Sequence, residues 1–185
     1  MKFFKLSLFI YLLCTILSCS TDAIVTNEED PIVATVDTED ADLLGTWTGI
    51  DVSYSGSMTS ITNGIATVQN IEGANFDGEY TITFEANPNV ITREGLYSIN
   101  EEITESNGDV VSTSIIDNLN LINSLTNWNL VEDELTMDSG GKIKTATIVE
   151  LTSTSLVLSI DESTSTTING VSETLLKNST FTFVR

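Results

Sequence analysis

The chain has no histidine and very few basic residues. Among its 185 residues, 7 lysines and arginines stand against 27 aspartates and glutamates. The absence of histidine removes the side chain best suited to proton transfer near neutral pH, and with it the commonest metal ligand. The formal charge of −20 gives a surface that repels nucleic acids and anionic lipid headgroups. We therefore expect no nucleic-acid partner.

Cysteines and long apolar runs are also scarce. The only cysteines are Cys14 and Cys19. The longest apolar run, Leu6–Leu17, has roughly a dozen residues, whereas a membrane-spanning helix needs about 20. This run follows a short basic start and is typical of a secretory signal peptide. Cleavage before Cys19 would leave one cysteine, which excludes a disulfide and a cysteine metal site.

The residues around the expected cleavage point carry a first resemblance. Ile16-Leu17-Ser18-Cys19 resembles the lipobox of bacterial lipoproteins. The resemblance implies that residues 1–18 are a lipoprotein signal peptide and that Cys19 is lipidated, with fatty acyl chains such as palmitate anchoring the mature chain to a membrane. It also implies a place in the cell envelope, at the outer membrane, facing either the periplasm or the outside. Ordinary secretion, with no role for Cys19, stays open as the alternative.

Residues 19–42 form an acidic tether between this cysteine and the domain. The segment after Cys19 holds eight acids, no base and one proline, and it has no sustained hydrophobic period. Such a composition predicts a disordered linker. Removal of Lys2 and Lys5 with the signal peptide changes the formal charge of the mature chain from −20 to −22. The folded domain is expected over residues 43–185.

The remaining sequence alternates between apolar and hydroxyl-bearing residues. Tyr80, Ile82 and Phe84 fall on one face of an expected strand, and the segments Leu156–Ile160 and Phe181–Phe183 repeat the pattern. Five dipeptides predict tight hairpin turns: Asn63-Gly64, Asp77-Gly78, Asn107-Gly108, Gly140-Gly141 and Asn169-Gly170. Further strands are expected at Thr46–Tyr54, Leu96–Thr104, Asp109–Ser114, Asn127–Val131, Glu134–Asp138 and Ile143–Leu151. The pattern predicts an all-β antiparallel domain of about 8–10 strands, arranged as a closed barrel or a sandwich.

One segment is ambiguous. Ile115, Leu119 and Ile122 are spaced for a helix, and Ser114 with Asp117 would suit a capping box at its start. The asparagines that follow weaken a helix. The segment Ser114–Leu125 is therefore either a helix or a loop.

The order of four motifs carries a second resemblance. Gly45-Thr46-Trp47 is followed by YTITFEANPN at Tyr80–Asn89, NWNLVEDELTM at Asn127–Met137 and IVELTSTSLVL at Ile148–Leu158. This order is similar to the lipocalin-like, calycin-type domains of Bacteroidota cell-envelope lipoproteins. The resemblance implies an up-and-down β-barrel in which Gly45 and Trp47 close one end, with Arg185 of the last strand lying across the indole. It also implies that the interior binds a small apolar ligand.

Aromatic residues are the candidates for lining such an interior. They would either fill the core or surround a ligand, and the sequence does not choose between these two roles. The candidate ligand-lining residues are Tyr80, Phe84, Tyr97, Trp128, Phe181 and Phe183.

Catalysis and metal binding are not expected. Serine and threonine are plentiful, but a nucleophile needs a positioned base, and Lys142 and Lys144 beside the Gly-Gly turn are expected to be solvated. We predict no catalytic residue, no cofactor and no metal. Calcium is the one cation weighed against this, because its ligands are carboxylate and carbonyl oxygens. The acids and amides considered for calcium, also expected to be solvated, are Asp117, Asn118, Asn120, Glu132, Asp133, Glu134 and Asp138.

The sequence thus predicts a non-enzymatic, membrane-anchored lipoprotein that binds a small hydrophobic molecule. The alternative is a structural, adhesion or glycan-accessory surface domain that works through its hydroxyl-rich faces and holds no internal ligand. The oligomeric state does not follow from the sequence.

Overall fold

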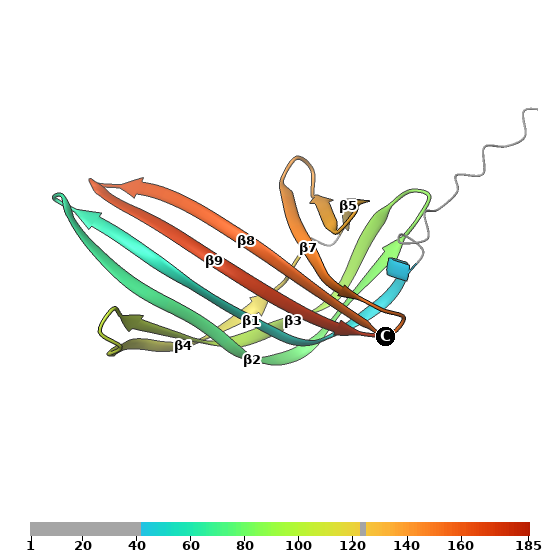
Figure 1. Ribbon diagram of the computed structural model, residues 1–185, viewed down its shortest axis with the longest axis horizontal. Coiled ribbons are helices and arrows are strands. Elements are labelled where there is room, and N and C mark those ends of the chain that lie inside the picture. Colours follow the sequence, from blue (N-terminus) through green and yellow to red (C-terminus); the bar gives the residue numbers. More distant parts are fainter. Residues whose placement is uncertain (1–41, 123–124) are drawn as a thin grey trace, which may run out of the picture. The chain divides into compact units, whose positions relative to one another are not determined.

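The computed structural model describes residues 42–122 and 125–185, and these residues form nine β-strands (Figure 1). The strands are β1 (Gly45–Thr62), β2 (Ile65–Glu85), β3 (Val90–Glu105), β4 (Val110–Leu119), β5 (Leu125–Val131), β6 (Glu134–Asp138), β7 (Ile143–Leu151), β8 (Ser155–Ile168) and β9 (Val171–Val184). The prediction of an all-β antiparallel domain is confirmed. The expected signal peptide, Cys19 and the tether up to residue 41 lie outside the described residues. Within the described ranges, no helix is both long enough and apolar enough to cross a membrane.

All nine strands belong to one antiparallel sheet, in the order β2-β1-β9-β8-β7-β6-β5-β3-β4. An additional pairing joins β2 to β3, from Gln69 opposite Glu105 to Glu85 opposite Val90. This pairing closes the order into a ring that passes through every strand except β4, which pairs with β3. The long strands β1, β2, β8 and β9 run side by side, with the β1–β2 and β8–β9 turns at the same end (Figure 1).

The alternation of side chains explains why the apolar residues share one face. Leu156, Leu158 and Ile160 of β8 are almost completely buried, as are Tyr80 and Ile82 of β2. They belong to one core cluster to which strands all round the ring contribute. Burial of a side chain of this size stabilises the fold by about 1.5–3 kcal/mol relative to leaving it exposed. The hydroxyl-bearing residues between them face the other side of the sheet.

The predicted hairpin turn at Asp77-Gly78 is wrong. Both residues lie inside β2, next to an irregularity in its pairing with β3 between Ala74 and Asp77. Gly78 has a φ of 144°, and a Cβ atom there would lie 2.5 Å from the carbonyl oxygen of Leu96. The glycine therefore serves a close approach of two strands rather than a reversal of the chain.

Three reversals of the chain use no glycine, so the glycine-containing dipeptides did not predict them. One is formed by residues 152–154, which connect β7 to β8. Residues 86–89 connect β2 to β3, and Asn87 there has a φ of 59°. Glu132 and Asp133 connect β5 to β6, with a φ of 57° at Glu132. The other four predicted dipeptides do lie between consecutive strands.

The segment Ser114–Leu125 begins as a strand, so the expectation of a helix or a loop is wrong for its first part. Ser114 pairs with Glu101 of β3, and Ile116 pairs with Ile99. Ile115, expected on the apolar face of a helix, is 65% exposed. Hydrogen bonds to β3 override the local spacing, because β3 offers β4 a full edge of backbone donors and acceptors.

Strands β1 and β2 extend well beyond their apolar pattern. Ser57 to Thr62 of β1 pairs in register with both β2 and β9, although this part shows no apolar alternation. At their far ends these strands are exposed. Backbone pairing rather than side-chain burial therefore defines this part of the sheet.

The end of the sheet opposite the β1–β2 and β8–β9 turns holds Trp47, Leu43 and Arg185. Trp47 is fully buried, and its Nε1 donates a hydrogen bond to the carbonyl oxygen of Leu43 at 2.8 Å. Cζ of Arg185 lies 4.0 Å from the centroid of the Trp47 ring. Nη2 of Arg185 donates to the carbonyl oxygens of Asp42 and Leu44 at 3.0 and 2.8 Å. The C-terminal arginine thus joins the segment before β1 to the end of β9.

We expect Arg185→Ala to lower the free energy of unfolding by about 1–2 kcal/mol, because it removes a cation–π contact and two charge-assisted hydrogen bonds. Urea unfolding followed by tryptophan fluorescence measures the change. Lys142→Ala, which removes the same charge from an exposed turn, is the control and should change stability little. Equal losses in the two variants would contradict the structural role of Arg185.

Candidate functional site

A cavity of about 240 Å³ lies on the inner face of the ring. Residues of β1, β3, β4, β7, β8 and β9 line it, together with Asn120 from the segment after β4. Its apolar wall consists of Val52, Ile99, Ile116, Leu119, Ile160 and Phe181, with the rings of Tyr54 and Tyr97. Its polar groups are Glu101, Asn120, Lys144, Glu162, Lys177 and Ser179.

The candidate ligand-lining aromatics divide into two groups. Tyr97 and Phe181 line the cavity and meet edge to face, with ring centroids 6.3 Å apart. Phe84 and Trp128 pack edge to face at 5.7 Å, away from the cavity lining. Tyr80 and Phe183 are also buried outside it, and Tyr80 meets Tyr97 at 5.4 Å. The ring interior is therefore filled by side chains in one part and hollow in another.

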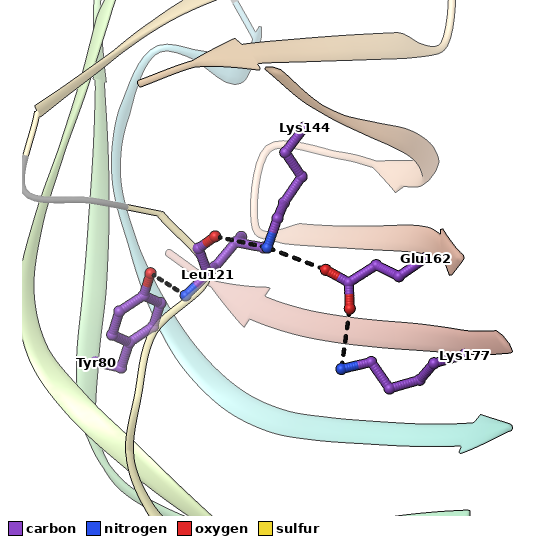
Figure 2. A network of polar contacts seen from close by, with 5 residues as sticks. All are labelled: Tyr80, Leu121, Lys144, Glu162 and Lys177. Atoms are coloured by element: carbon purple, nitrogen blue, oxygen red, sulfur yellow. Dashed lines mark hydrogen bonds and ion pairs between the residues drawn. The ribbon is translucent and has the colours of Figure 1, made fainter. Parts of the chain in front are cut away.

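The segment after β4 lies at the boundary between these two parts. The backbone N–H of Leu121 donates to the hydroxyl of Tyr80 at 3.1 Å. Nζ of Lys144 donates to the carbonyl oxygen of Leu121 at 3.3 Å (Figure 2). Leu121 and Ile122 are both buried in the core cluster. Both backbone polar groups of Leu121 are thus satisfied by side chains, as burial of irregular backbone requires.

Two lysines share one carboxylate inside the cavity. Nζ of Lys144 lies 3.3 Å from Oε1 of Glu162, and Nζ of Lys177 lies 2.9 Å from Oε2 (Figure 2). All three side chains are partly buried. Burial alone would raise the pKa of Glu162, but hydrogen bonds and charge from Lys177 and Lys144 outweigh burial and hold this pKa below its usual value. Glu162 is consequently held in its ionised form.

A tyrosine–carboxylate pair faces these ions. The Tyr54 hydroxyl donates to Oε2 of Glu101 at 2.6 Å. Nζ of Lys177 lies 5.0 Å from the centroid of the Tyr54 ring. Burial, and then the hydrogen bond to Glu101, raise the pKa of Tyr54 above its usual value, so the phenol stays protonated. The aromatic ring of Tyr54 lies over Gly73. A Cβ atom added to this glycine would stand 2.3 Å from carbon atoms of the Tyr54 ring.

These charged residues were not among the site residues proposed from the sequence. The expectation that Lys144 is solvated is wrong, because its ammonium group contacts Glu162 and Leu121. The alternation of inward and outward side chains along β7 and β8 could have identified them. Lys144 lies two residues before buried Ala146, and Glu162 lies two residues after buried Ile160, so each shares the inner face with its neighbour.

Larger hollows exist on the protein, but they lack buried walls. One of about 650 Å³ is lined by residues of β2, β3 and β4, among them Glu72, Glu102 and Ile115. Most of its lining side chains are exposed. The smaller cavity combines buried apolar walls with converging polar groups, the usual composition of a ligand site.

The described residues offer no metal centre. Within 42–122 and 125–185, no group of three or more acidic, histidine or cysteine side chains could hold an ion. Among the side chains whose burial the structure describes, the only buried polar ones are Thr126 and Ser179, and none of these is a carboxylate. What the cavity offers chemically is charge and hydrogen bonding beside apolar walls.

The ion cluster predicts a specific pH dependence of stability. Because the pKa of Glu162 is lowered by folding, its contribution is present above the ordinary value of 4.5 and is lost as the pH falls through the folded value. The groups facing it are Lys144, Lys177, Tyr54, Tyr97 and Glu101. Wild type should therefore be more stable than Glu162→Gln at pH 7, and the difference should shrink towards zero in strong acid.

Urea unfolding of both proteins at a series of pH values measures this difference. Glu150→Gln removes the same charge from an exposed position and reports the effect of net charge alone. A difference between wild type and Glu162→Gln that persists unchanged in acid would rule out an ionic origin.

The chain was also compared with known proteins. No protein-family model, no curated protein and no solved structure matches it.

Proposed function

We propose that the domain is a lipocalin-like β-barrel of a membrane-anchored lipoprotein, and that it binds a small molecule in the cavity without catalysing a reaction. The observation that carries this proposal is the cavity itself. It lies on the inner face of a closed ring of strands, with an apolar wall and a small set of converging polar groups.

The size of the cavity sets the size of the ligand. At about 240 Å³ it falls just below the range of roughly 300–1,000 Å³ that drug-sized ligands occupy. An apolar cavity of roughly 150 Å³ is large enough to hold benzene. The ligand is accordingly about the size of one ring or a short chain with one head group.

Different observations support the proposed barrel and the proposed lipid anchor. The β2–β3 pairing and the contact between Trp47 and Arg185 are what a lipocalin-like barrel would require. The anchor, and with it a place at the outer membrane, rests on the lipobox resemblance of Ile16–Cys19.

Filling the cavity should abolish ligand binding. Val52 is buried in the wall, so Val52→Phe places a ring in the hollow. Native mass spectrometry of wild type purified from its host should show a bound small molecule, and the variant should lose it. Val149→Phe adds the same ring at a position that is 64% exposed, and should keep the ligand. Retention of the ligand by both variants would place its binding site elsewhere.

The lipid anchor has a separate test. Cys19→Ala should prevent acylation, since the thiol that accepts the lipid is gone. Metabolic labelling with an alkyne analogue of palmitate, followed by fractionation, should label wild type in the membrane and leave the variant unlabelled. Cys14→Ala serves as the control and should be labelled normally. Labelling of Cys19→Ala would exclude Cys19 as the anchor.

One observation favours the adhesion alternative. The exposed ends of β8 and β9 carry paired hydroxyl groups, Ser165 with Thr174 at 3.1 Å and Thr167 with Ser172 at 3.0 Å. Such rows could contact a glycan. A glycan array that compares wild type with Val52→Phe separates the two functions, because this substitution changes the cavity and not these hydroxyls.

A further inference from the structure

We propose that the ligand of this cavity is an amphipathic monoanion, most simply a carboxylate, whose head group lies between the ammonium groups of Lys144 and Lys177. This inference rests on the proposed function and adds the chemical class of the ligand. It is carried by the arrangement of charge and hydrogen-bond donors at the polar side of the cavity.

The donors in the cavity outnumber their partners. A lysine ammonium group has three N–H donors. Among the described residues, Nζ of Lys177 has one ionic partner, Glu162, and Nζ of Lys144 has two partners, Glu162 and the carbonyl oxygen of Leu121. Both carboxylates of the cavity are already engaged, Glu162 by the lysines and Glu101 by the Tyr54 hydroxyl. Both ammonium groups therefore keep N–H donors that no described protein group accepts.

The charge of the ion cluster formed by Lys144, Lys177 and Glu162 also favours an anion. Lys144 and Lys177 share the single carboxylate of Glu162, so these three groups together carry one net positive charge. Across residues 42–185 the formal charge is 5 − 20 = −15, so a positive cluster runs against the character of the domain. Glu101, the other carboxylate of the cavity, offsets this charge when the whole lining is counted, but it is bound by the Tyr54 hydroxyl and forms no ion pair with either lysine. Acids on the exposed surface act weakly, because their charges are screened beyond about 8–10 Å at physiological salt. One monoanion would neutralise the cluster.

The apolar wall supplies the other half of the site. Val52, Ile99, Ile160 and Phe181 line the same cavity as the two lysines. A ligand with one anionic end and one apolar end would satisfy both sides at once. An inorganic anion would leave the apolar wall hydrated, and a neutral hydrocarbon would leave the ammonium donors unpaired.

The test compares two probes of the same shape. 3-Phenylpropionate carries a carboxylate, and 3-phenylpropanol is its neutral analogue. Isothermal titration calorimetry with the purified protein should give a dissociation constant about tenfold or more lower for the acid, since hydrogen bonds to charged groups are the stronger ones. Raising the salt concentration should weaken the binding of the acid and leave that of the alcohol unchanged.

Variants locate the effect. Lys177→Met and Lys144→Met should each bring the affinity for the acid close to that for the alcohol. Lys142→Met makes the same chemical change on an exposed residue two positions before Lys144 and should retain the preference. Lys177→Arg keeps the charge and should retain most of it, which separates recognition from loss of folding. Circular dichroism checks that each variant is folded.

The outcomes separate this inference from the function on which it rests. Equal binding of acid and alcohol by wild type would overturn the inference and leave the cavity as a ligand site. An acid preference that survives in both Lys144→Met and Lys177→Met would also overturn it. Binding of neither probe by wild type, together with no ligand in native mass spectrometry, would remove the proposed function as well.

Discussion

The hydrogen bonds between β2 and β3 are the constraint on which the rest of the structure depends. Without them the strands would form an open sheet with two free edges, and the apolar face would need a second layer to cover it. With them the sheet covers its own apolar face, and the core cluster draws residues from strands far apart in the sequence. The ring also creates an inner surface where side chains from five of its strands, together with those of β4, can meet around one cavity.

Side-chain size and charge then divide this inner surface. Trp47, Tyr80, Phe84 and Phe183 are bulky and almost completely buried, and they fill one part. Further along β1 and β9, and on the neighbouring β8, the inward positions become Tyr54, Lys177 and Glu162, whose charged or hydroxyl ends cannot pack as densely. The hollow begins where the apolar alternation gives way to ionisable residues that keep the inward direction.

A partly buried ion cluster is an unusual place for two of the few lysines of an acidic chain. Such clusters contribute little net stability, because desolvation offsets much of their attraction. The carboxylate of Glu162 does hold both ammonium groups at one side of the cavity, and Leu121 holds Lys144 from another direction. The arrangement orients donors towards the hollow, which is the geometric basis for assigning it an anionic ligand.

The sequence by itself determined the class of the fold, since strict alternation at Tyr80–Phe84 and Leu156–Ile160 is compatible with strands and not with helices. It also located most strands and four of the turns, because Asn-Gly and Gly-Gly pairs adopt positive φ at little cost. Only the tertiary structure decided that Ser114 to Leu119 is a strand, because hydrogen bonds to β3 outweigh a local spacing that also suits a helix. The charged site is a mixed case. Alternation places Lys144, Glu162 and Lys177 on the inner face, and the two-residue turn at Asn169-Gly170 sets Glu162 opposite Lys177. The β7–β8 pairing has an irregularity between Ile148 and Glu150 that no local pattern encodes, so only the tertiary structure decided that Lys144 joins them.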